Sequence, residues 1–123
     1  MRKDMIFGKS VAESLPQTTV SGGEFGNGVN TARTYAAKHT ILAGAVTTAI
    51  VIKLQHSDTD GTYVDVDDAK VIGGVNSVSI SASEDNTAVE ICGVDLKLFQ
   101  RLAIVSGAGA ISATVTVADY LGE

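Results

Sequence analysis

The chain lacks tryptophan altogether, and it has one cysteine, one proline and few aromatic residues among its 123 residues. A single cysteine, Cys92, cannot form an intramolecular disulfide, which excludes the disulfide-stapled scaffold of small secreted domains. With 5% aromatic and 45% hydrophobic residues, the core must consist of valine, isoleucine, leucine and alanine. Thirteen glycines beside one proline favour many short strands joined by turns over a helical bundle.

Basic residues are also scarce, since nine Lys and Arg stand against fourteen Asp and Glu, a formal net charge of −5. Proteins that bind nucleic acid or an anionic membrane surface depend on clustered Lys and Arg. The N-terminus lacks the apolar core of a signal peptide. The longest apolar-rich run, residues 41–52, is shorter than the roughly 20 residues that span a bilayer. We therefore predict a protein made in a cytoplasm, without direct nucleic-acid or membrane binding.

The central pattern of the chain is residues 47–66, TTAIVIKLQHSDTDGTYVDV. Ile50, Ile52 and Leu54 fall on one face, which is the period of two expected of a half-buried strand. The next residues, 57–61, are of the types that reverse the chain direction. Alternation resumes after them, so the segment predicts a β-hairpin.

Similar alternating segments recur about every 8–12 residues, which is typical of a sandwich or a barrel. Residues 111–118 alternate most regularly, and the Gly-Ala-Gly at 107–109 predicts a hairpin turn before them. We predict an all-β fold: a single-domain antiparallel β-sandwich of jelly-roll type over residues 1–123, with about 8–9 short strands. An immunoglobulin-like sandwich is the alternative, although it usually has a buried tryptophan.

The N-terminal quarter of the chain contains a glycine-rich stretch. Residues 21–30, SGGEFGNGVN, contain four glycines and two asparagines and predict a long loop. Long ordered loops are often contact or functional segments. We expect residues 1–30 to take part in contacts with other subunits or a partner. The candidate contact residues are Met5, Ile6, Phe7, Gly23, Phe25, Gly26 and Asn27.

The outward faces of two predicted strands carry small, uncharged side chains. These are Ser77, Ser79, Ser81 and Ser83 on one strand, and Ser112, Thr114 and Thr116 on the other. Exposed strands of a monomer usually carry more Lys and Glu, which discourage edge-to-edge association. Two interpretations stay open: a solvated sheet, and a surface that packs on another subunit.

An acidic turn at residues 58–61, Asp-Thr-Asp-Gly, resembles part of a calcium-binding loop. If Gly61 took the invariant glycine position, His56 would be the first ligand and Asp67 would replace the bidentate glutamate. Both residues depart from the pattern, and a strand precedes the turn where that loop requires a helix. A plain hairpin turn is the favoured interpretation, and no metal ligand is predicted.

Residue types that could catalyse a reaction do not occur in a useful arrangement. Residues 56–58, His-Ser-Asp, are consecutive, whereas the members of a hydrolytic triad meet from separate segments. Cys92 has no base beside it, and His39 has no metal-ligand spacing with the other histidine. Residues 22–28 lack the Gly-Lys-Ser/Thr ending of a phosphate-binding loop. We predict no catalytic residue, no cofactor and no enzymatic activity, with a hydrolase as the weakest alternative.

Two segments carry a resemblance to a known family. Residues 54–66, LQHSDTDGTYVDV, and residues 98–122, LFQRLAIVSGAGAISATVTVADYLG, follow an apolar N-terminal tag and a glycine-rich loop. In this order they resemble the capsid decoration, or cement, proteins of tailed bacteriophages, which have a jelly-roll fold. The resemblance implies a homotrimer on the outside of the virion, bound to the major capsid protein and stabilising the shell.

The same hairpin is similar to one in discoidin-like sugar- or lipid-binding domains. Those domains have a tryptophan where this chain has Tyr63, and a cysteine pair that this chain lacks. We therefore predict a non-enzymatic virion structural protein of the capsid surface, made in the host cytoplasm. The alternative is a carbohydrate- or ligand-binding β-sandwich module of a phage tail or host-attachment apparatus.

Overall fold

The computed structural model describes residues 5–30, 36–82 and 87–120, and within these residues the chain is an antiparallel all-β protein. Its strands are β1 (Met5–Val20), β2 (Val29–Asn30), β3 (Ala36–Ser57), β4 (Val64–Asp65), β5 (Val78–Ile80), β6 (Ala88–Val94) and β7 (Phe99–Tyr120), with one 3-10 turn, η1 (Asp68–Lys70). All seven strands belong to one sheet. The predicted all-β class is confirmed, and the connectivity of a jelly roll stays a prediction.

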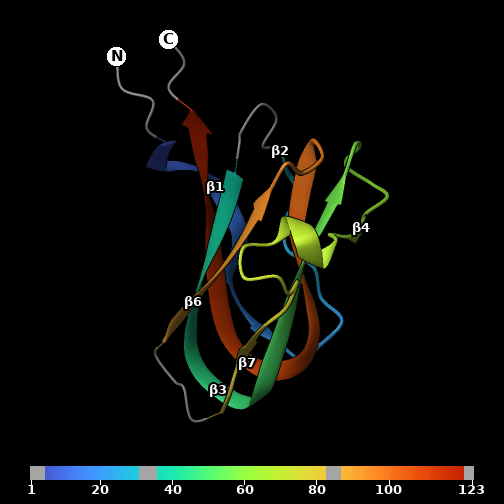
Figure 1. Ribbon diagram of the computed structural model, residues 1–123. Coiled ribbons are helices and arrows are strands. Elements are labelled where there is room, and N and C mark those ends of the chain that lie inside the picture. Colours follow the sequence, from blue (N-terminus) through green and yellow to red (C-terminus); the bar gives the residue numbers. More distant parts are fainter. Residues whose placement is uncertain (1–4, 31–35, 83–86, 121–123) are drawn as a thin grey trace.

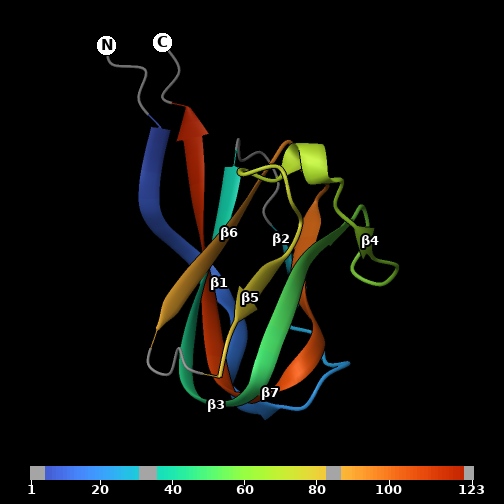
Figure 2. The ribbon, with the colours of Figure 1, turned by 60° about the horizontal axis from the view of Figure 1, so that its bottom comes forward.

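Two long strands organise the sheet. β3 and β7 have 22 residues each and pair antiparallel, from Ala36 opposite Ala118 to Ser57 opposite Phe99. The register shifts several times between residues 43 and 52 of β3, and both strands bend sharply there (Figures 1 and 2). Each long strand therefore contributes one half to each of two facing layers.

The shorter strands complete the two layers. β1 and β6 flank the first layer, which holds the start of β3 and the end of β7. β2, β4 and β5 flank the second layer, which holds the other two halves. The result is a β-sandwich made from one folded sheet.

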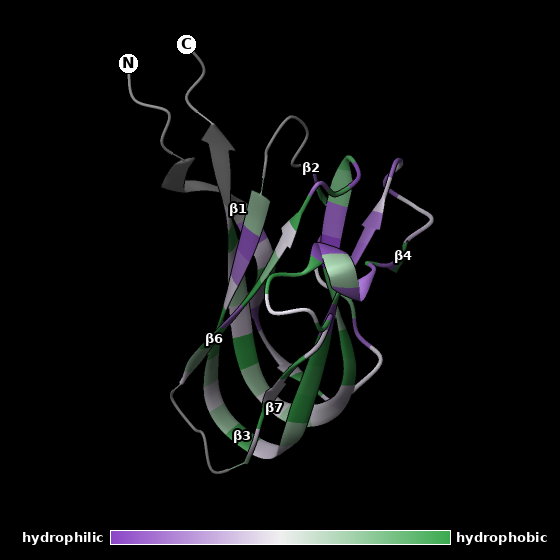
Figure 3. Cartoon of the chain, viewed as in Figure 1, coloured by the Kyte–Doolittle hydropathy of each residue, from purple (hydrophilic) through white to green (hydrophobic). Residues whose placement is uncertain are grey.

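A large aliphatic cluster fills most of the space between the layers, and a smaller one consists of Val29, Ala37 and Val115. The fully buried members of the large cluster come from both layers and include Ile41, Ile50, Ile52, Leu54, Ile80, Leu102, Ile104 and Ile111. Burying each such side chain contributes about 1.5–3 kcal/mol to folding. Figure 3 shows the hydrophobic residues along the curved middle of β3 and β7, and hydrophilic residues around β4 and η1. The predicted inward face of the central hairpin is confirmed at Ile50, Ile52 and Leu54.

The predicted hairpin turn at residues 107–109 is wrong, because β7 continues through it. Gly107 has φ +103°, and a Cβ there would overlap the backbone of Ala49 and Ile50. A Cβ on Gly109 would meet the backbone of Ala45 and Val46. Because these glycines have no side chain, β7 can bend close to the backbone of β3. Glycines that usually end a strand therefore allow this strand to continue and curve. For the same reason the structure has a few long strands where about nine short ones were expected.

An asparagine side chain holds the connection between β4 and β5 against the second layer. The side chain of Asn76 accepts a hydrogen bond from the Leu54 amide at 2.8 Å and donates to the Leu54 carbonyl at 2.9 Å. It also donates to the Val66 carbonyl at 2.9 Å. Asn76 is 5% exposed, so it satisfies buried backbone groups where no strand pairs with them.

The packing at the bend can be tested with two glycines that have almost the same φ. These are Gly107 in the bend, with φ +103°, and Gly73 outside it, with φ +104°. No atom lies within 4 Å of a Cβ placed on Gly73. Gly73→Ala should therefore cost only the left-handed strain of about 1–2 kcal/mol. Gly107→Ala adds a backbone overlap and should cost more than about 3 kcal/mol, measured by urea unfolding. Equal losses in the two variants would contradict the close packing at the bend.

Candidate functional site

The glycine-rich segment 21–30, predicted to be a long loop, lies along β7 as an irregular edge. Gly23 donates its amide to the Ile104 carbonyl at 2.7 Å, and Gly26 donates to the Leu102 carbonyl at 2.8 Å. Ile104 donates in return to the Glu24 carbonyl at 2.8 Å, and Phe25 forms a β-bridge with Ala103. The segment therefore has a fixed backbone conformation and register.

Contacts at both ends of this segment hold it further. The Glu24 carboxylate accepts hydrogen bonds from the amides of Ser21 and Gly22 at 2.9 and 2.7 Å. The hydrogen bond from the Ser21 amide is the main reason that the pKa of Glu24 is lowered. Asn27 donates its amide to the Ser14 carbonyl of β1 at 2.8 Å. A Cβ on Gly28 would overlap the side-chain ends of Tyr63 and Asp60, so the segment passes close to the turn after β3.

The side chain of Arg101 contacts two aromatic rings on the outside of the second layer. Its guanidinium carbon is 3.8 Å from the centroid of the Phe25 ring and 4.2 Å from that of Tyr63. Its Nε donates a hydrogen bond to Gln55 Oε1 at 2.9 Å. Each cation–π contact at a partly exposed site contributes about 0.5–1 kcal/mol. Side chains from three parts of the chain, namely the edge segment, β3 and the turn after β3, thus contact one guanidinium.

A chain of polar contacts extends outward from this arginine. Gln55 donates from Nε2 to Asp65 Oδ1 at 2.9 Å, and Lys53 Nζ lies 3.4 Å from Asp65 Oδ2. The hydrogen bond from Gln55 is the main cause of the lowered pKa of Asp65. The Tyr63 hydroxyl donates to Asp60 Oδ1 at 2.6 Å. Burial, followed by this hydrogen bond, raises the pKa of Tyr63 to about 12, so the hydroxyl remains a donor at neutral pH.

We call this surface the Arg101 face; it consists of Phe25, Lys53, Gln55, Asp60, Tyr63, Asp65 and Arg101. Phe25 is 53% exposed although its backbone is fixed, and Val105 on the same side of β7 is 49% exposed. Exposed apolar side chains on a rigid backbone, beside a held arginine, are the composition of a binding surface.

The structure brings together some of the predicted contact residues and separates others. Gly23, Phe25, Gly26 and Asn27 lie together in the edge segment, where Phe25 reaches the Arg101 face. Met5 and Ile6 pair with Tyr120 and Asp119, and Phe7 follows them in β1. Those three residues lie beside the opposite half of β7, so they do not belong to the same site.

Sequence reasoning missed the residues at the centre of the face. The sequence signal for Arg101 is weak but present, because it is the one charge among the mainly apolar residues 98–105. Its register opposite Gln55, and the approach of Tyr63 from the following turn, depend on pairing that the sequence pattern does not specify.

The two histidines lie far apart in the pairing of β3 and have different surroundings. His39 is fully buried, its Nε2 is 3.3 Å from Gln100 Oε1, and burial lowers its pKa to about 4. Its Nδ1 has no hydrogen-bond partner in the part of the chain that the structure describes. His56 Nδ1 accepts a hydrogen bond from the Lys97 amide at 3.3 Å, and burial lowers its pKa too. His39 is therefore a neutral core residue, and it lies inside the sandwich, not at a strand end.

Within residues 5–30, 36–82 and 87–120, the structure does not bring together the side chains of the other sites considered from the sequence. No group of three His, Cys, Asp or Glu side chains within these ranges could hold a metal ion. In the acidic turn, the Asp60 carboxylate accepts from Tyr63, whereas Asp58 lies 3.9 Å from Lys97. Burial raises the pKa of Cys92, the opposite of what a reactive thiolate requires.

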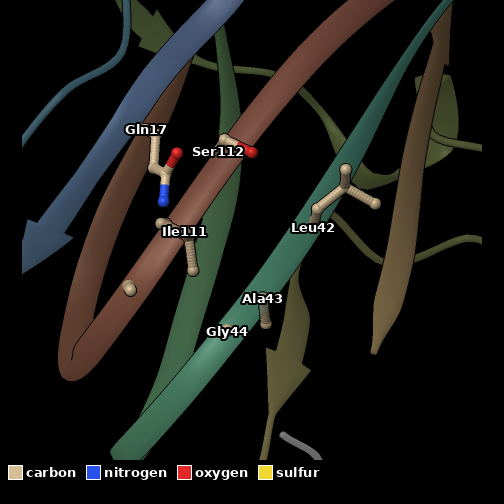
Figure 4. Close-up of a pocket in the computed structure, with 7 residues that line it drawn as sticks. Gln17, Leu42, Ala43, Gly44, Ile111 and Ser112 are labelled. Atoms are coloured by element: carbon tan, nitrogen blue, oxygen red, sulfur yellow. The ribbon is translucent and has the colours of Figure 1, made fainter. Parts of the chain in front are cut away.

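A shallow hollow of about 200 Å³ lies at the bend of the first layer (Figure 4). It is lined by Gln17 of β1, residues 42–44 of β3 and residues 110–112 of β7. Ligand sites for small molecules usually occupy about 300–1,000 Å³ and are more enclosed. The Arg101 face, and not this hollow, is the stronger candidate for binding.

Comparison with protein-family models and with curated protein sequences finds no match to this chain. Within the described residues, no helix is long and apolar enough to cross a membrane. The site must therefore be interpreted from its own geometry.

The buried histidine makes stability depend on pH. The pKa of His39 is about 4 in the folded protein and about 6.5 in an unfolded chain. Its neutral form is favoured by folding, so this contribution is complete above pH 6.5 and is lost as the pH falls toward 4. Between pH 7 and pH 5 the free energy of unfolding should fall by about 2 kcal/mol from this group, measured by urea titration.

His39→Gln keeps a side chain that can hydrogen-bond to Gln100 but removes the titrating group. Most of the loss between pH 7 and pH 5 should disappear in this variant, leaving only the part due to His56. The same pH dependence in the variant and the wild type would show that His39 is not the cause.

Proposed function

We propose that the protein is a non-enzymatic virion structural protein, a head decoration protein of a tailed bacteriophage that binds the outside of the capsid and stabilises it. Three features support this proposal: the all-β sandwich, the resemblance of the hairpin segments to that family, and the Arg101 face. The observation that carries the proposed adhesion is the fixed exposed ring of Phe25, held at 3.8 Å from the Arg101 guanidinium.

The composition of this face suits attachment to another protein. Arginine and aromatic residues are enriched at protein–protein interfaces and contribute most of the binding free energy there. In this chain their side chains are ordered before binding by stacking and by the hydrogen bond to Gln55. Less conformational entropy is then lost on association, which favours binding by a small surface.

The proposed mechanism is adhesion repeated over the shell. Each copy would contribute a modest contact to the major capsid protein, and association into a homotrimer would multiply the contacts through effective concentration. The outer side of the first layer offers a surface for such self-association. On this side Thr40 lies opposite Thr114 and Leu42 lies opposite Ser112, and Leu42 is 54% exposed.

A second candidate function is carbohydrate binding within a tail or host-attachment apparatus. The observation that favours it is an exposed aromatic ring beside polar groups, here Phe25 with Gln55 and Asp65, because sugars stack on such rings and hydrogen-bond to such groups. The absence of specific binding on a glycan array that includes bacterial surface polysaccharides would contradict this candidate.

Binding to phage heads tests the proposed function. The full chain should sediment with empty heads assembled from the major capsid protein encoded in the same genome, and light scattering should show a trimer. Phe25→Ala should weaken the binding at least tenfold, as expected at an interface hot spot of about 2 kcal/mol.

Ile72→Ala provides the control for that experiment. Ile72 is 65% exposed, comparable with Phe25, but it lies on the connection after η1 and hydrogen-bonds to β6. This variant should bind heads as the wild type does. A monomeric chain that never sediments with heads would contradict the proposed function.

A further inference from the structure

We propose that the guanidinium of Arg101 is a preformed binding site for a carboxylate, supplied by an Asp or Glu side chain of the partner protein. This inference rests on the proposed function, since it specifies the chemistry by which the Arg101 face would recognise that partner.

Within the part of the chain that the structure describes, hydrogen bonds use one edge of the guanidinium. Nε donates to Gln55 Oε1 at 2.9 Å, and the guanidinium carbon lies over the rings of Phe25 and Tyr63. Among the described residues, no hydrogen bond or ion pair is recorded for the two Nη groups. The edge formed by these two groups is therefore available to an acceptor from outside.

The two acids of the Arg101 face are held by other groups. Asp60 accepts from the Tyr63 hydroxyl, and Asp65 accepts from Gln55 and pairs with Lys53. Both carboxylates already have partners, and each is held by a different group. A charged, planar donor that is fixed in place and lacks an anion is suited to bind one from a partner.

The shape and charge of the site favour a carboxylate over phosphate. Two parallel N–H donors of a guanidinium match the two oxygens of a carboxylate in a bidentate pair. Phosphate has a similar geometry but carries more negative charge, about −1.5 at neutral pH. The neighbouring Asp60 and Asp65, and the net charge of −5, would repel it more strongly.

The surrounding surface favours a protein over an acidic sugar as the source of the carboxylate. A sugar would stack on an open ring face, but Phe25 and Tyr63 each turn one face toward the guanidinium. The exposed Phe25 ring lies against the guanidinium and would exclude water from one side of the ion pair. An arginine–carboxylate pair beside an aromatic ring is typical of a protein–protein hot spot.

NMR of the arginine side chains tests the carboxylate site in the intact chain. Sodium acetate is added at constant ionic strength, with chloride as the reference salt, and the Nη signals of Arg101 are compared with those of Arg2 and Arg33. The Arg101 signals should shift and saturate, and the other two should change only weakly. Equal responses from all three arginines would overturn the proposal.

Two further titrations identify the class of anion and its source. Phosphate at the same ionic strength should bind Arg101 more weakly than acetate, and glucuronate should bind no more tightly than acetate. Tighter phosphate binding would overturn the preference for a carboxylate. Glucuronate binding at least tenfold tighter than acetate would overturn a protein as the source and indicate an acidic sugar.

Arg101→Lys extends the test to phage heads, because it keeps the charge but loses the two-donor edge. It should bind heads at least tenfold more weakly than the wild type. Wild-type affinity in this variant would overturn the inference. If the variant does not fold, as judged by its amide spectrum, the acetate titration of the wild-type chain still decides.

The two proposals fail in different ways. A wild-type chain that does not bind heads contradicts the decoration function, whatever acetate does at Arg101. If the wild-type chain binds heads but acetate does not shift the Arg101 signals, only the carboxylate site is contradicted.

Discussion

The antiparallel pairing of β3 with β7 is the interaction on which the rest of the structure depends. Because the two strands stay paired through a shared bend, one hairpin-like ladder forms the centre of both layers and encloses the aliphatic cluster between them. The same register places the outer side chains. Gln55 lies opposite both Arg101 and Asp65, and Ala103 lies opposite both Lys53 and Phe25, so the Arg101 face is a consequence of strand pairing.

Much of the fold could be predicted from the sequence, because period-two alternation reports directly which side of a strand is buried. Ile50, Ile52 and Leu54 were placed correctly for that reason. The Gly-Ala-Gly at 107–109 was misinterpreted, since glycine permits both a turn and a close approach of two backbones. The choice between them depends on a partner strand that is some 60 residues away in the chain.

The candidate site, like the fold, could be predicted only in part from the sequence. Phe25 and its neighbouring glycines were recognisable as a distinctive segment, but the sequence indicated a loop, whereas the backbone is held along β7. Arg101 and Tyr63 could not be joined to Phe25 without the register of three segments. The resulting surface combines a rigid backbone, an exposed ring and a held cation. Such a surface can bind without rearrangement, and that suits the proposed attachment of many copies to one shell.

The most direct test of this account is a cryo-electron microscopy structure of phage heads that carry the bound chain. The account predicts that the Arg101 face points toward the shell, with a carboxylate of the major capsid protein within hydrogen-bond distance of the Arg101 Nη groups. A structure in which the chain is bound through another surface, with Phe25 and Arg101 turned toward solvent, would contradict it.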